Sequence, residues 1–179
     1  QDARRPLALA PLRQALREVL THRTVLMAIA VQTLCFACLF GTLSSTQQIF
    51  DQTFDRGDSF PLWFALIALL SSSASMINAA LVVRLGMRAL ISATLQAQIG
   101  LSALFALLWV TGALPPMLIF PAYILWTTSV FMMAGLVLGN LNAIALEPMG
   151  HIAGMAASVS GAVATVLAVM IAAPMGLAF

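Results

Sequence analysis

Charged side chains are scarce in this chain of 179 residues, and their scarcity argues against a water-soluble fold. Only 8% of the residues are charged and 61% are hydrophobic, whereas ordinary soluble domains contain about 25% charged residues. All eight Lys and Arg positions are arginine, so lysine is absent. So few cations, joined to long apolar segments, also argue against a nucleic-acid-binding protein. The composition predicts an integral membrane protein instead.

Residues suited to catalysis or metal binding are also few. The two histidines, His22 and His151, lie at predicted membrane boundaries, and no Ser-His-Asp set, metal cluster or glycine-rich phosphate loop can be assembled. Glu147 lies on the same turn as His151, but a loop acid beside a loop imidazole is a simpler interpretation than an acid–base pair. We therefore expect no enzyme activity, no metal site and no cofactor.

Only two cysteines occur, and they form the motif C-x-x-C at Cys35 and Cys38. A redox or metal-binding role needs a stabilised thiolate, which an apolar helix without a basic neighbour disfavours. We therefore expect two buried thiols, and they carry no information about the redox compartment.

Long apolar segments make up most of the chain. Each is long enough to cross a bilayer as a helix of about 20 residues, and together they are too many and too long for a signal peptide. The sequence thus predicts an all-α membrane domain at residues 24–179, which we expect to be a fragment of a larger protein. Its five predicted spans are residues 24–43, 60–83, 89–110, 117–146 and 153–177.

Residues 1–23 are the Arg-rich part of the chain. From Leu9 onward, Leu12, Leu16 and Val19 recur at helical spacing opposite Arg13 and Arg17. This pattern predicts a linker with a short amphipathic helix that lies on the membrane surface.

The placement of arginine predicts the orientation. If residues 1–23 and the turns at 84–88 and 147–151 share one side, seven of the eight arginines lie there, and only Arg56 lies opposite, within a loop that carries three aspartates. The arginine-rich side is then cytoplasmic by the positive-inside rule. We expect the polar run at residues 44–48 to end the first span and begin that opposite loop.

The last two spans meet in a predicted tight loop at residues 147–151. Pro148 removes a backbone donor and disfavours helix at Glu147, and Gly150 tolerates a left-handed cap. The span before this loop carries Asn140 and Asn142, which need partners in hydrocarbon. Packing against other helices and a functional role were equally compatible with these asparagines.

Two sequence strings resemble a known family. The run at 139–158, G-N-x-N-A-x-A-L-x-P-x-G-H-x-A-G-x-A-A-S, resembles the tenth and eleventh spans of major facilitator superfamily efflux pumps. Within that superfamily it is most similar to the bicyclomycin/chloramphenicol-resistance (Bcr/CflA-like) drug:proton antiporters. The string M-I-N-A-A-L-V-V-R-L-G-M-R at 76–88 resembles their loop motif through Asn78, Arg84, Gly86 and Arg88. Ala80 and Val83 stand where the family often has further arginines, and no aspartate precedes Arg84.

The resemblance covers nearly the whole chain, as spans seven to eleven of a twelve-span transporter. It implies proton-coupled efflux of drugs or other small apolar molecules by alternating access in the bacterial cytoplasmic (inner) membrane. Its implied partners are a small-molecule substrate, membrane lipid and the missing N-terminal half. No Asp, Glu, Lys or Arg lies deep inside a predicted span, so a coupling carboxylate would belong to that missing half.

Four residues are candidates for a substrate cavity. Gln32 is the one strongly polar residue of the first span, and Phe36 follows on the same side. Asn140 lies two turns from Met133 and so shares its side, whereas Asn142 is rotated by about 200° and is assigned to helix packing. Gln32 bonding a neighbouring helix, and Met and Phe acting as core residues, are open alternatives. Small residues that let helices touch complete the packing set with Asn142, namely Gly154, Ser158 and Gly161.

A different class of function is also compatible with the sequence. A non-transporting membrane scaffold or assembly subunit would use its small-residue faces to dock partner helices. The Arg-Gly turn and the G-N-x-N hairpin favour the transporter, because they lie where a transporter repeat would place them.

Overall fold

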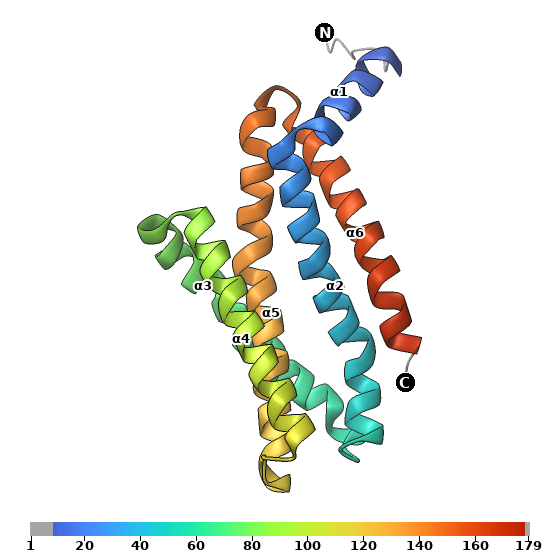
Figure 1. Cartoon of the computed structure of the whole chain (residues 1–179), viewed down its shortest axis with the longest axis vertical. Coiled ribbons are helices and arrows are strands. Elements are labelled where there is room, and N and C mark those ends of the chain that lie inside the picture. Colours follow the sequence, from blue (N-terminus) through green and yellow to red (C-terminus); the bar gives the residue numbers. More distant parts are fainter. Residues whose placement is uncertain (1–8, 178–179) are drawn as a thin grey trace.

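The computed structural model describes the chain from residue 9 to residue 177 as a bundle of α-helices, with no strand in that range (Figure 1). Two short 3₁₀ helices, η1 (Gly57–Ser59) and η2 (Glu147–Ile152), lie in the connections. The α-helices are α1 (Leu9–Thr21), α2 (Arg23–Gln52), α3 (Phe60–Leu85), α4 (Met87–Thr111), α5 (Pro116–Leu146) and α6 (Ala153–Leu177).

The long helices have the length and composition of membrane spans. In the described residues four apolar helical stretches are long enough to cross a bilayer, and the last of them contains α5 and most of α6. On α3 only Ile67 and Ala74 are buried, while Leu62 and Leu69 are more than 70% exposed. A helix that is apolar on all sides suits a lipid environment. These features support an all-α integral membrane protein, as the composition predicts.

Helix α5 is the centre of the bundle, because it packs against α2, α3 and α4. Helix α2 also packs along α6 on its other side. In Figure 1, α2 and α6 run downward and α3 and α5 run upward, so the contacting pairs α2/α6 and α3/α5 are each parallel. Helix α1, the turn between α3 and α4, and η2 lie in the upper part of the figure. These three elements thus lie toward the same end of the helices, and the side of the membrane that this end faces stays a prediction.

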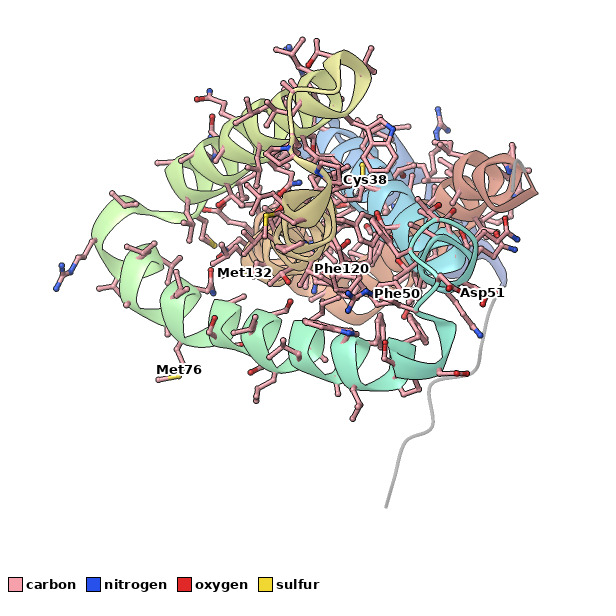
Figure 2. All side chains as sticks on the ribbon, turned by 90° about the horizontal axis from the view of Figure 1, so that it is seen from below. Cys38, Phe50, Asp51, Met76, Phe120 and Met132 are labelled. Atoms are coloured by element: carbon pink, nitrogen blue, oxygen red, sulfur yellow. The ribbon has the colours of Figure 1, made fainter. Side chains whose placement is uncertain are left out.

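Aromatic side chains gather at the opposite end of the bundle. The rings of Phe50 and Phe120 are 5.5 Å apart, edge to face, and Figure 2 shows both within the core. The guanidinium of Arg56 lies 4.5 Å from the centre of the Phe120 ring. Phe54 and Trp63 pack on the same ring at 5.0 and 4.9 Å. These contacts fix the connection between α2 and α3 against the start of α5.

The predicted end of the first span is wrong as a helix boundary. Helix α2 continues through the polar run at 44–48 and ends at Gln52. The hydroxyls of Ser44 and Thr46 donate to the backbone carbonyls of Gly41 and Thr42. The helix therefore satisfies its own polar side chains, and a polar run need not end it.

The hairpin between α5 and α6 forms differently from the prediction. Glu147 has helical dihedral angles (φ −50°, ψ −50°) although Pro148 follows it, and Gly150 is not among the residues with positive φ. The break lies instead at Met149 (φ −111°, ψ 23°). Its side chain is 1% exposed and packs in the core cluster with Val25 and Ala156. Burial of this side chain decides the turn over local proline and glycine preferences.

Helix α1 buries Ala15 and Val19, whereas Leu16 and Leu20 are 40% and 37% exposed. Val19 is fully buried in the cluster that joins α2, α5 and α6, and Nε2 of His151 lies 3.0 Å from Oε1 of Glu18. Arg13 and Arg17 are exposed, as predicted. Val19 therefore packs on the protein, and the contact of the rest of α1 with a membrane surface stays a prediction. Residues 1–8 of the predicted linker, and the Leu12 side chain, lie outside the described part.

Candidate functional site

The interior of the bundle holds polar side chains that carry no charge. In the described part of the chain, the buried polar residues are Gln32, Thr33, Ser45, Thr46, Thr127, Thr128, Asn140 and Ser160. Most of the threonines bond their own helix, as Thr33 Oγ1 does to the Ile29 carbonyl at 2.8 Å. Gln32 and Asn140 are the buried amides of this set, and an amide can both donate and accept hydrogen bonds.

Asn140 makes a short side-chain hydrogen bond between α5 and α3, in addition to the bond from the Ser71 hydroxyl to the Thr128 carbonyl at 3.4 Å. Nδ2 of Asn140 donates to Oδ1 of Asn78 at 2.6 Å and to the Leu136 carbonyl at 2.7 Å. Asn140 is 6% exposed, whereas Asn142 is only half-buried. Asn140 thus performs the packing role that the sequence assigned to Asn142. Its contact with a substrate stays a prediction.

The contributions of Asn78 and Asn140 to the free energy of unfolding should be coupled. Replacing Asn78 or Asn140 by Ala removes one partner and leaves the other without its bond in an apolar environment. We expect a double-mutant cycle on the free energy of unfolding in mixed micelles to give a coupling of about 0.6 to 1.7 kcal/mol. A matched cycle of Asn78→Ala with Asn142→Ala should be additive. A coupling of zero in the first cycle would show that the bond contributes no stability.

Gln32 and Phe36 are four residues apart on α2 and so share one side of that helix. Gln32 is 4% exposed, and its Oε1 has no hydrogen-bond partner among the described residues. Phe36 packs on the cluster shared by α2, α5 and α6, and its ring stacks on Phe40 at 5.6 Å. The buried Ser160 hydroxyl of α6 is likewise unpartnered. A buried amide oxygen without a bond is costly, so this position has a free acceptor for a ligand or a rearranged helix.

Met133 lies in a different place. It is 3% exposed and lines a groove of about 370 Å³ between α3, α4 and α5. Met132, Gln98 and Ser129 also line this groove, which Leu81 and Leu85 close from α3. Figure 2 shows Met132 between α5 and α3. Thioethers beside neutral polar groups are a lining that adapts to apolar ligands.

The four cavity candidates do not share one pocket in this conformation. Phe36 packs on the cluster that joins α2, α5 and α6, Met133 lines the groove beside α4, and Asn140 is bonded to α3. Met133 and Asn140 are both buried on α5, but their helical spacing carries no information about which neighbouring helix each meets. A shared contact with a substrate stays a prediction.

The turn between α3 and α4 depends on Gly86. This residue has φ 79° and ψ 156°, ends α3 and begins α4. Its N–H donates to the Val82 carbonyl at 2.9 Å, and its carbonyl accepts from the Leu90 N–H at 3.1 Å. Arg84 and Arg88 flank the turn and are exposed. The loop motif therefore presents two cations on a rigid turn.

The small residues of α6 form two sides, and only one is packed within the described chain. Gly154 and Ser158 are exposed and Gly161 is half-buried, with no atom within 4 Å of an added Cβ on either glycine. Helix α6 packs on α2 through a different set. Its buried members repeat every four residues, at Ala156, Ser160, Ala164, Ala168 and Ala172.

The cysteines are partly as predicted. Cys35 is buried in the cluster around Met133, but Cys38 is exposed. The two side chains are one helical turn apart, and the edge of the α2 contact surface passes between them. The described residues contain no group of three or more His, Cys, Asp or Glu side chains that could hold a metal ion.

Comparison with known proteins does not identify a relative. No protein-family model, no curated protein and no solved structure matches this chain.

Proposed function

We propose that this chain forms most of the C-terminal half of a major facilitator superfamily transporter of the Bcr/CflA-like type. The whole protein would export drugs or other small apolar molecules in exchange for protons, by alternating access. It would lie in the bacterial inner membrane with the α1 end in the cytoplasm.

The observation that carries this proposal is that two units of the bundle each pack their first helix against the second helix of the other unit. The first unit is α2, α3 and α4, and the second begins with α5 and α6. The first helices, α2 and α5, are antiparallel and pack on each other, and each also packs in parallel on the second helix of the other unit. Such inverted repeats are a common architecture of secondary transporters, whose sites lie near the bilayer midplane between the repeats. A scaffold protein has no need of this arrangement.

The chemistry of the interior supports an apolar, uncharged ligand. The buried polar side chains of the described residues are all neutral, and the groove beside Met133 is lined by leucines, methionines and a few neutral polar groups. A charged ligand would lack a counter-ion there. The coupling carboxylate would belong to the N-terminal half of the transporter.

The exposed features of the chain are consistent with a partner half. Gly154 and Ser158 leave one side of α6 open to close contact with another helix, and Arg84 and Arg88 would meet the partner at the cytoplasmic end. The same open side of α6 would serve a scaffold, so transport itself must be measured.

Transport can be tested in cells that lack other exporters. The complete transporter containing this chain should lower the accumulation of an apolar fluorescent dye, and a protonophore should abolish the effect. Met132→Trp fills the groove and should raise accumulation towards that of cells without the protein. Met76→Trp should not, because Met76 is 78% exposed and points away from the bundle (Figure 2).

Expression must be matched between the variants by quantitative blotting. Equal dye accumulation with and without the protein, over a panel of apolar compounds, would sink the transport proposal. Equal activity of both tryptophan variants would leave transport standing and remove the groove from the substrate path.

A further inference from the structure

We propose that a second pocket, at the end of the bundle opposite α1, binds a flat, neutral aromatic molecule that enters from the bilayer. The pocket has a volume of about 440 Å³ and lies between α2, α4 and α5. This is within the usual range for small-molecule sites. None of Gln32, Phe36, Met133 or Asn140 lines it, so the proposal does not depend on the transport function.

Aromatic rings from two helices form most of its walls. Phe105 and Trp109 come from α4, and Tyr123 and Trp126 come from α5. The rings of Phe105 and Trp126 are stacked, 5.4 Å apart and 11° from parallel. Tyr123 lies 6.1 Å from Trp126, in a tilted orientation. A planar ligand can continue this set of ring contacts, by stacking or by its edge, whereas an acyl chain cannot.

The rings are held in place before any ligand binds. The indole Nε1 of Trp126 donates to Oγ of Ser102 on α4 at 3.0 Å. Tyr123 is 3% exposed, and its ring packs on Phe54 at 5.4 Å. Fixed side chains lose little conformational entropy on binding. The pocket is therefore preformed rather than a gap between mobile side chains.

The remaining walls decide the charge of the ligand and its route. Ile49 of α2 and Thr53, the residue that caps the end of α2, face the rings, and no charged residue lines the pocket. A charged ligand would be desolvated there without a counter-ion. Trp109 is half-exposed and Val110 is largely exposed, and both lie at the end of α4. Tryptophan and tyrosine favour the membrane boundary, so the opening faces the level at which amphipathic aromatic molecules gather.

The neutral dye N-phenyl-1-naphthylamine tests this site in lipid nanodiscs. Trp109 and Trp126 should transfer excitation energy to the bound dye, with a signal that saturates. Ala106→Phe puts a ring into the pocket from α4, and we expect the Kd of the dye to rise about tenfold or more. Ala103→Phe adds the same ring to an exposed position of α4 outside the pocket, and should leave the Kd within about twofold.

Thr53→Tyr narrows the pocket from the end of α2 and covers the case in which Ala106→Phe does not fold. Thr53 is exposed, so this variant should remain monodisperse and should also weaken dye binding. Phenanthrene should displace the dye and hexadecane should not. The proposal is overturned if neither pocket variant weakens binding, if Ala103→Phe weakens it equally, or if hexadecane displaces the dye as well as phenanthrene does. If the unchanged protein exports dyes but shows no saturable binding of N-phenyl-1-naphthylamine, this site is refuted and the transport proposal stands.

Discussion

Replacing Gly86 by asparagine is expected to destabilise the protein more than any other single glycine substitution in its turns. The backbone at Gly86 has φ 79° and ψ 156°, a region in which residues with a Cβ are rarely found. A residue with a side chain there raises the free energy of the folded state by about 1 to 3 kcal/mol. Otherwise the turn must change its conformation, which breaks the two hydrogen bonds that cap α3 and α4. We expect a lower yield of monodisperse protein and a lower midpoint of thermal unfolding in detergent.

Gly112 provides the matched control for this prediction. It also has a positive φ, but at φ 63° and ψ 20° it is in the left-handed helical region, which asparagine tolerates. Space is not the difference, because an added Cβ would meet no atom within 4 Å at either glycine. Gly112→Asn should therefore lower the unfolding midpoint less than Gly86→Asn. Equal effects of the two substitutions would show that the conformation of Gly86 is not what limits stability.

Replacing Ala164 by leucine is expected to force α6 away from α2. Ala164 is fully buried, and it lies in the middle of the series of small residues that repeats every four positions along α6. Extra methylene groups in such a contact cost about 1 to 3 kcal/mol through strain. The midpoint of thermal unfolding, measured by size exclusion after heating, should fall by several degrees.

Ala162→Leu is the control for the α6 contact. Ala162 lies only two positions away on the same helix, but it is exposed, so the same added volume meets no buried neighbour. Its unfolding midpoint should stay close to that of the unchanged protein. A larger loss for Ala162→Leu than for Ala164→Leu would mean that the packed side of α6 is the one that carries Gly154 and Ser158.

The asparagines show how much of the candidate site can be predicted from the sequence pattern. Their presence inside an apolar span predicts that they need partners, because a polar group in hydrocarbon without a bond is costly. The sequence does not say which helix supplies the partner. The partner of Asn140 is Asn78 of α3, a residue far away in the chain, so the pairing depends on how α3 packs against α5. The aromatic pocket could not be predicted from the sequence either. Its rings come from two helices, and the packing of those helices sets their rotation.

The sequence by itself determined the class of the protein and the extent of most of its helices. Apolar length is a local property, and a backbone without water must close its hydrogen bonds within the helix, so α3 to α6 begin and end within about two residues of the predicted spans. Only the tertiary structure decided the polar end of α2, the turn at Met149 and the packed side of α6. In each case several local choices cost nearly the same free energy, and burial against another helix selected one of them.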